Sequence, residues 1–282
     1  MTVGDDSLPP LKDIIKQFSL SAKKSLGQNF LLDMNITRKI ARHAGAAPDT
    51  HFLEVGPGPG GLTRALLMEH VKHITVIEKD ERCLDILDQI AQAYPNKVKI
   101  IHGDALKLPL NDIMSAGQPF RIAANLPYNI SSEILIKWLR EAHQSPWLSA
   151  TLMFQKEFAM RLQAKEGSKD YGRLSVLCGV LADVKRLFDL NPAHFTPPPK
   201  VTSSVVQIIP KKNPVKCDIS VLEKVTQACF GQRRKMLRQS LKQLNSTPEE
   251  LCKLANISPE ARADHITVQD YVTLTNLLAS ST

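Results

Sequence analysis

The chain has 282 residues and a formal net charge of +8, a balance that favours an anionic partner such as nucleic acid. Its five cysteines show no C-x-x-C pair and no metal-site spacing, so we expect reduced thiols in a cytoplasmic protein rather than a disulfide framework. The sequence shows no leader peptide and no apolar run of about 18 residues, so neither secretion nor a membrane span is expected.

The first motif in chain order is a strand, a glycine turn and a helix start. His51–Val55 is predicted to be a buried strand, Gly56–Gly61 follows with the pattern G-x-G-x-x-G, and Leu62–Leu67 begins a helix. Glycines let a ligand approach the backbone closely, and a helix start offers free N–H groups. Glu78 ends the next predicted strand, Ile74–Ile77, where an acid can accept hydrogen bonds from both ribose hydroxyls. This pattern suits a dinucleotide or S-adenosylmethionine.

Polar residues at further strand ends favour S-adenosylmethionine over a dinucleotide. Glu54 lies two residues before the glycines, where an anion suits a cationic ligand better than a pyrophosphate. Asp104 follows the predicted strand that begins at Val98, and it can accept a hydrogen bond from an adenine amine. Asn125 follows a fourth strand, Phe120–Ala124. In a doubly wound parallel sheet these strand ends meet at the carboxyl edge, which is where ligands bind.

The turn Asn125-Leu126-Pro127-Tyr128 suits a planar base that carries an exocyclic amine. The Asn125 oxygen and the adjacent carbonyl can accept the two N–H bonds of the amine. Pro127 fixes φ and lacks an N–H, so it holds these carbonyls in place. Tyr128 offers a face on which a base can stack. An ordinary turn at the end of a strand is the alternative interpretation.

After about residue 155 the alternation of strands and helices stops. A late strand is predicted over Ser203–Ile209, and Pro210–Pro214 reads as a linker. Helices are predicted over Val221–Phe230, Arg233–Leu244, Thr247–Ala255 and Val268–Leu278, with N-caps at Ser220, Thr247 and Thr267. The sequence therefore predicts an α/β doubly wound sheet with a small C-terminal all-α domain.

The predicted second helix of this domain is strongly basic. The segment Gly231–Lys242 of the domain contains no acid and carries five positive charges, at Arg233, Arg234, Lys235, Arg238 and Lys242. Positions 234, 238 and 242 recur at i, i+4 and i+8, so they would share one helix face. This pattern predicts a phosphate-binding edge, and a merely solvated basic face is the alternative.

Six stretches carry a resemblance to a known family, and this resemblance covers roughly residues 20 to 275. They are Lys24–Leu31, Leu53–Gly58, Asn125–Ser131, Gln155–Glu157, Tyr171–Ser175 and Phe195–Val201. The chain resembles the ribosomal RNA adenine N6-dimethyltransferases, specifically the bacterial KsgA type. The resemblance implies a Rossmann-like class I S-adenosylmethionine-dependent methyltransferase sheet. It assigns a variable N-terminal extension to residues 1–21, the methyltransferase domain to 22–211 and a helical rRNA-binding domain to 212–282.

The resemblance also implies roles for individual positions. The cofactor S-adenosyl-L-methionine would be contacted by Asn29, Leu31, Gly56, Glu78, Asp104 and Asn125. Asn125 and Tyr128 would hold the target adenine, and Phe195 would stack on its other face. A core aromatic before a proline turn is the alternative for Phe195. The chemistry requires no metal, because the sulfonium methyl group is already activated.

The implied reaction is N6-dimethylation of two adjacent adenosines in the 3′-terminal hairpin of 16S rRNA. The expected partner is this rRNA within the small ribosomal subunit or its precursor, and we expect a cytoplasmic monomer. A macrolide-resistance type enzyme acting on large-subunit 23S rRNA is the nearest alternative. A non-catalytic RNA-binding assembly factor and a nicotinamide-dependent oxidoreductase are two others. The oxidoreductase would need neither the Asn125–Tyr128 turn nor the basic C-terminal segment.

Overall fold

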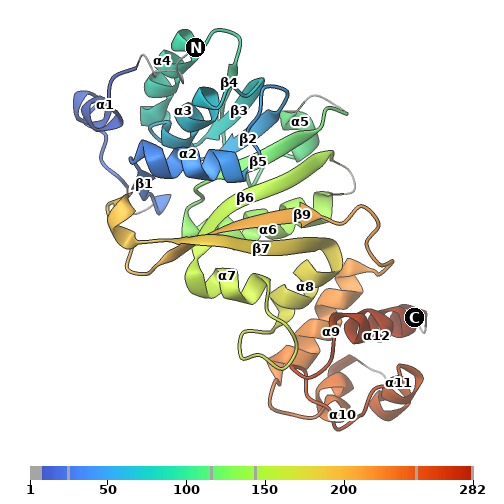
Figure 1. The fold of residues 1–282 in the computed structure, drawn as a ribbon. Helices are drawn as coiled ribbons and strands as arrows, with labels where there is room; N and C mark the ends of the chain where they lie inside the picture. Colours follow the sequence, from blue (N-terminus) through green and yellow to red (C-terminus); the bar gives the residue numbers. More distant parts are fainter. Residues whose placement is uncertain (1–7, 24–25, 115–116, 143–144, 245–246, 281–282) are drawn as a thin grey trace. The chain divides into compact units, whose positions relative to one another are not determined.

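The computed structural model describes residues 8–23, 26–114, 117–142, 145–244 and 247–280 (Figure 1). Lys24 and Ser25, which open the first of the six matching stretches, lie outside the described residues. Across the described ranges, every helix is too short or too polar to traverse a lipid bilayer.

Contacts divide the chain into two compact units, each made of two sequence segments. The first unit contains Met1–Lys156 and Lys185–Pro210, and the second contains Glu157–Val184 and Lys211–Thr282. The C-terminal helices therefore group with residues 157–184, a segment that the sequence assigned to the methyltransferase domain.

The strands form a seven-stranded sheet in the order β4-β3-β2-β5-β6-β9-β7 (Figure 1). Their bounds are β2 His51–Val55, β3 His73–Glu78, β4 Val98–His102, β5 Phe120–Ala124, β6 Trp147–Gln155, β7 Ala182–Leu190 and β9 Ser203–Pro210. Strands β2 to β6 are paired in parallel, and β9 is antiparallel to β6. The predicted doubly wound α/β sheet is confirmed, and the predicted strands over 51–55 and 120–124 have the predicted bounds.

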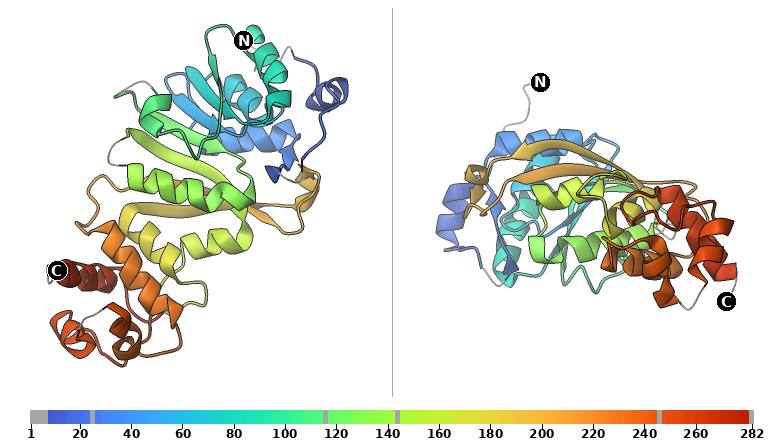
Figure 2. Two further views of the ribbon diagram at one scale, coloured as in Figure 1. Left: turned by 180° about the vertical axis from the view of Figure 1, so that it is seen from behind. Right: turned by 90° about the horizontal axis from the view of Figure 1, so that it is seen from below.

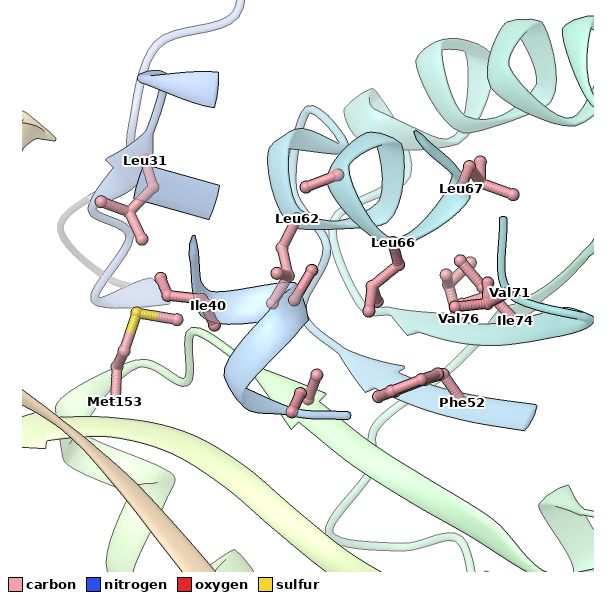
Figure 3. Packing of buried hydrophobic residues seen from close by; sticks show 14 of the residues in the cluster. Leu31, Ile40, Phe52, Leu62, Leu66, Leu67, Val71, Ile74, Val76 and Met153 are labelled. Carbon is pink, nitrogen blue, oxygen red and sulfur yellow. The ribbon is translucent and has the colours of Figure 1, made fainter. Parts of the chain in front are cut away.

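Helices cover both faces of the sheet, because α2 (Met34–His43) and α6 (Tyr128–Glu141) lie on opposite sides (Figures 1 and 2). Helix α3 (Gly61–Met68) begins after the glycine turn, and its Leu62 and Leu66 point toward the sheet (Figure 3). These side chains belong to one buried cluster with residues of β2 and β3. Burying a side chain of this size contributes about 1.5–3 kcal/mol, so the cluster fixes α3 and the turn before it. Two further helices are α4 Leu84–Ala93 and α5 Leu110–Ile113.

The described part of the predicted N-terminal extension is folded onto the first unit. Helix α1 (Leu11–Gln17) buries two of its apolar side chains. The guanidinium of Arg64, in α3, donates to the carbonyls of Pro9 at 2.7 Å and Leu8 at 3.2 Å. Because Arg64 is itself buried, these carbonyls replace water as its partners and hold the extension in place.

The second unit is helical. Its helices are α7 Lys156–Leu162, α8 Arg173–Leu181, α9 Ile219–Gly231, α10 Leu237–Ser240, η4 Leu241–Leu244, α11 Pro248–Leu254 and α12 Val268–Ser280. Three aromatic rings meet in its interior, with Phe230 5.9 Å from Tyr171 and 5.5 Å from Tyr271 between centroids. The buried Tyr271 hydroxyl donates to the carbonyl of Ala263 at 2.7 Å. The Tyr171–Ser175 stretch thus contributes a core residue to this unit.

The predicted helix over Arg233–Leu244 is wrong. The helix α10 begins only at Leu237 and passes after four residues into the short 3-10 helix η4. Met236 is extended, with φ −66° and ψ 152°, and it forms a bridge with Arg262. The amides of Leu237 and Arg238 donate to the carbonyls of residues 261 and 259, so this backbone pairs with another segment instead of an upstream helical turn. Periodicity alone does not reveal such a tertiary pairing.

The predicted helix caps are confirmed in two of three cases. Thr247 occupies the N-cap of α11. Thr267 and Asp270 exchange side-chain to backbone hydrogen bonds of 2.8 and 3.1 Å at the start of α12, which is a capping box. The cap predicted at Ser220 is instead Asp218, whose carboxylate accepts from the backbone of Ser220 at 2.8 Å. The carboxylate of Asp218 is preferred over the Ser220 hydroxyl as the N-cap of α9, because its negative charge also interacts favourably with the helix dipole.

Candidate active site

A cavity of about 180 Å³ opens at the carboxyl edge of the sheet. Its lining includes eight residues named from the sequence: Asn29, Leu31, Glu54, Gly56, Glu78, Asp104, Asn125 and Tyr128. Parallel strands that lie side by side end at one edge, so residues far apart in the sequence converge there. The four polar strand ends Glu54, Glu78, Asp104 and Asn125 all line this one cavity.

The glycine turn brings the backbone to the cavity wall. Gly56 has φ +67°, and a Cβ built there would meet no atom of the described structure within 4 Å. The space over Gly56 is therefore open to a ligand. A Cβ on Gly61 would lie 2.5 Å from the carbonyl oxygen of Leu31, so glycine is needed where the N-terminal segment crosses the start of α3.

Glu54 is a buried acid in the cavity wall. It is 1% exposed, and the hydroxyl of Thr63 donates to its Oε2 at 2.6 Å. Burial raises the pKa of Glu54 to about 8, and the neighbouring carboxylate of Glu78 adds to this effect. The carboxyl is therefore protonated near neutral pH until a positive charge approaches it.

Glu78 is fixed by three backbone amides. Its Oε2 accepts from Gly58 N at 2.9 Å, and its Oε1 accepts from Lys79 N and Asp80 N, both at 2.8 Å. Burial raises the pKa of Glu78, while these amide hydrogen bonds work in the opposite direction. The carboxylate therefore links the glycine turn to the turn after β3 and stays at the cavity edge.

Asp104 is an ionised acceptor on the loop after β4. The ammonium of Lys79 lies 2.8 Å from its Oδ2 and holds the pKa of this carboxyl below its usual range. The loop itself is held by Lys137 of α6, whose Nζ donates to the carbonyls of Ala105 and Leu106, both at 3.1 Å, and also to that of Leu108. Lys137 therefore joins the Asp104 loop to the helix that begins at Tyr128.

The orientation of Asn125 is set by a backbone carbonyl. Its Nδ2 donates to the carbonyl of Asn29 at 2.7 Å, which leaves Oδ1 as the acceptor. Pro127 follows with φ −55° and ψ 130° and forms the N-cap of α6. Tyr128 is the first residue of α6, and its hydroxyl is hydrogen-bonded to that of Ser203 in β9. Burial raises the pKa of Tyr128, so the phenol stays neutral.

Phe195 is placed in the core. It belongs to the two-residue strand β8 (Phe195–Thr196), which pairs antiparallel with β1 (Phe30–Leu31) so that Leu31 faces Phe195. Its side chain is 3% exposed and belongs to the buried cluster of the first unit, outside the described lining of the cavity. The alternative interpretation of Phe195, a core aromatic before the proline turn, therefore describes its position in this structure.

The five basic residues of the C-terminal segment have different surroundings. Arg233 Nε donates to Asp264 Oδ2 at 3.3 Å, and its Nη2 donates to the carbonyl of Ser168 at 3.1 Å. Arg238 is half-buried, with its Nε shielded from solvent. Exposed side chains are found at Arg234, Lys235 and Lys242. The shared helix face expected for positions 234, 238 and 242 is absent from this described segment, because residue 234 precedes α10.

Sequence reasoning missed the residues that hold the site groups in place. Ser203 lies 75 positions from Tyr128, and no local pattern connects the two. Gln28 donates to Asp80 at 2.9 Å across 52 positions. Thr63, the partner of Glu54, lies on the first turn of α3, and the strand–turn–helix geometry could have indicated it.

Comparison with known proteins identifies sequence relatives over almost the whole chain. The sequence profile of a family described as ribosomal RNA adenine dimethylase matches residues 19–280. A protein named ribosomal RNA small subunit methyltransferase A from Agrobacterium fabrum is 52% identical over 274 residues, covering 97% of this chain and 99% of the relative. Its namesake from Xanthobacter autotrophicus is 51% identical over 275 residues, covering 97% of this chain and 95% of the relative.

Two solved structures share the fold. A dimethyladenosine transferase from Plasmodium falciparum matches with a TM-score of 0.73 and 26% identity, covering 88% of this chain and 96% of that one. The 23S rRNA methyltransferase ErmE matches with a TM-score of 0.66 and 26% identity, covering 89% and 100%. With its cavity at the carboxyl edge of the sheet and a family profile that matches nearly its full length, the chain belongs to the ribosomal RNA adenine dimethylase family.

Proposed function

We propose that this chain dimethylates N6 of two adjacent adenosines in the 3′-terminal hairpin of 16S rRNA. Family membership makes it an rRNA methyltransferase that uses S-adenosyl-L-methionine. The names of relatives that are 51–52% identical support the small subunit as the substrate. The observation that carries the proposed chemistry is the orientation of the Asn125 side chain. Its amide nitrogen donates to the carbonyl of Asn29, so its oxygen can accept a hydrogen bond from the target amine.

The cavity residues fit S-adenosylmethionine, which carries a net positive charge. The hydrogen bonds of Glu54 and Glu78 come from a hydroxyl and from backbone amides, so two buried carboxyls are available to a cationic ligand. Asp104 can accept from an adenine amine, and Gly56 offers open space against the backbone. When bound, the cofactor supplies a methyl group that its sulfonium has already activated.

The target amine requires activation by hydrogen bonds, because its lone pair is delocalised into the purine ring. Acceptance of its two N–H bonds by Asn125 Oδ1 and the Leu126 carbonyl favours a tetrahedral nitrogen and returns the lone pair. The same oxygens stabilise the positive charge that develops on nitrogen during transfer. Pro127 keeps the carbonyl in place, and stacking on Tyr128 contributes about 1–3 kcal/mol per base.

The second unit is proposed as the rRNA-binding domain. Its exposed residues Arg234, Lys235 and Lys242 are proposed as direct phosphate contacts. Arg233 and Arg238 are proposed to act less directly, because one is paired with Asp264 and the other is half-buried. The proposed partner is 16S rRNA in the small subunit or its precursor, bound by a cytoplasmic monomer.

A large-subunit substrate is the second candidate, supported by the likeness to ErmE. It ranks behind the small subunit, because identity to ErmE is 26% whereas identity to the small-subunit relatives is 51–52%. The likeness of this chain to rRNA methyltransferases over most of its length also disfavours the oxidoreductase interpretation.

The deciding experiment offers labelled S-adenosylmethionine with purified small subunits, large subunits and naked 16S rRNA. We expect label in the small subunit, recovered as dimethyladenosine at two adjacent positions by mass spectrometry. The control variant Asn125→Ala should bind rRNA but transfer almost no label. Label confined to large subunits would move the proposal to the second candidate, and full transfer by Asn125→Ala would remove the proposed mechanism.

A further inference from the structure

The segment Leu26–Leu31, which we term the bridging segment, lines the cavity between two functional turns. One is the turn after β3, which follows Glu78 and contains Asp80, and the other is the turn Asn125–Tyr128. The bridging segment makes side-chain or backbone hydrogen bonds to both turns. Its position therefore allows one turn to influence the other.

On the cofactor side, the contact is made by Gln28. Its Nε2 donates to Asp80 Oδ2 at 2.9 Å, and its Oε1 accepts from the backbone amide of Lys23 at 2.9 Å. Asp80 is 4% exposed and lies two residues after Glu78. Hydrogen bonds from Arg82 and Gln28 lower the pKa of Asp80 to about 2, so a charge-assisted bond holds Gln28 at neutral pH.

On the target side, the two neighbours of Gln28, Gly27 and Asn29, contact residues of the turn Asn125–Tyr128 and the start of α6. The carbonyl of Asn29 accepts from Asn125 Nδ2 at 2.7 Å. Gly27 has φ +63°, and a Cβ there would lie 2.8 Å from Asn129 Oδ1 and 3.2 Å from Pro127 Cβ. The bridging segment thus lies directly against the target turn, and a shift of a few tenths of an ångström would change the Asn29–Asn125 hydrogen bond.

We propose that Gln28 is a positioning residue for the methyl transfer, acting through Asn29 on the amide of Asn125. The Gln28–Asp80 bond fixes the bridging segment, so that the Asn29 carbonyl selects the Asn125 orientation in which Oδ1 accepts from the target amine. This inference rests on the proposed function of Asn125. It predicts that cofactor binding near Glu78 and alignment at Asn125 are energetically coupled through residues 27–29.

The test is a double-mutant cycle with Gln28→Leu and Asn125→Ala, in which leucine occupies a similar volume but makes no hydrogen bond. The first readout is the calorimetric Kd for S-adenosylmethionine, which stays measurable when turnover is lost. The second is the split between kcat and KM for small subunits. Gln17→Leu, an exposed site on α1, is the matched control and should behave as wild type.

We expect Gln28→Leu to weaken cofactor binding and to lower kcat, each by about tenfold, with little change in KM for small subunits. In the Asn125→Ala background the same substitution should change the Kd by less than about twofold, because its effect passes through the lost amide. A purely structural role would give equal factors in both backgrounds and would overturn the inference while leaving the proposed function intact. Wild-type behaviour of Asn125→Ala would instead overturn the proposed function.

Gly27→Ala keeps the test decisive if Gln28→Leu fails to fold. The new methyl group pushes the bridging segment away from Asn129 while the side chain of Gln28 remains. The same coupling with Asn125 is expected, with a lower kcat and an intact melting transition. Additive effects of Gly27→Ala and Asn125→Ala would overturn the positioning role.

Discussion

Replacing Glu54 by glutamine should stabilise the cofactor-free protein at alkaline pH and weaken its binding of S-adenosylmethionine. Burial raises the pKa of Glu54 to about 8, compared with an ordinary value of 4.5. Between these pH values the unfolded chain has lost a proton that the folded protein keeps, so the free energy of unfolding falls as the pH rises. Since one pKa unit corresponds to about 1.36 kcal/mol, the loss reaches on the order of 5 kcal/mol above pH 8.

Glutamine avoids this loss because it does not ionise, and its amide oxygen can still accept from Thr63. Urea unfolding of both proteins at about pH 5.5 and about pH 9 should show a stability difference that grows in favour of Glu54→Gln as the pH rises. Cofactor affinity should fall at both pH values, because the variant offers no negative charge to the cation. A stability difference that does not change with pH would refute the reasoning.

Glu69→Gln is the matched control for this experiment. Burial opposes ionisation of Glu69, but hydrogen bonds from Arg42 and Arg38 hold its pKa below the ordinary value. Its contribution to stability is present above the unfolded pKa and is lost only in acid. The difference between wild type and Glu69→Gln should therefore be constant from about pH 6 to about pH 9.

Further substitutions test the other parts of the site. Glu78→Ala should weaken S-adenosylmethionine binding by at least about tenfold in calorimetry, because a charge-assisted hydrogen bond typically contributes about 1.5–3 kcal/mol; an unchanged Kd would contradict its cofactor role. Tyr128→Phe and Ser203→Ala remove the same hydrogen bond, so each should raise KM for the rRNA substrate, and the double variant should have the same KM as either single variant. A KM in the double variant that equals the product of the two single effects would show that the two hydroxyls act separately. Arg234→Glu with Lys242→Glu should weaken rRNA binding and flatten its salt dependence in titrations without altering cofactor affinity; an undiminished slope would indicate a solvated basic face.

The site could be predicted from the sequence because its polar side chains lie at the ends of strands. Buried strands such as His51–Val55 have a strong apolar pattern, and parallel pairing then brings Glu54, Asp104 and Asn125 to one edge without further information. Partners that come from distant segments leave no such pattern. The Tyr128–Ser203 bond and the pairing of Met236 with Arg262 depend on tertiary structure, and the latter is why a helical charge pattern was misread.

The division of the chain into two interrupted units has a consequence for folding during synthesis. Residues 1–156 reach the ribosome exit first, but strand β9, which pairs with β6, follows only at 203–210. The second unit starts at residue 157, and its last helix, α12, is synthesised only at residues 268–280. All segments of the first unit have therefore been synthesised at residue 210, whereas the second unit lacks α12 until residue 280 has been added, so the two units can be completed one after the other.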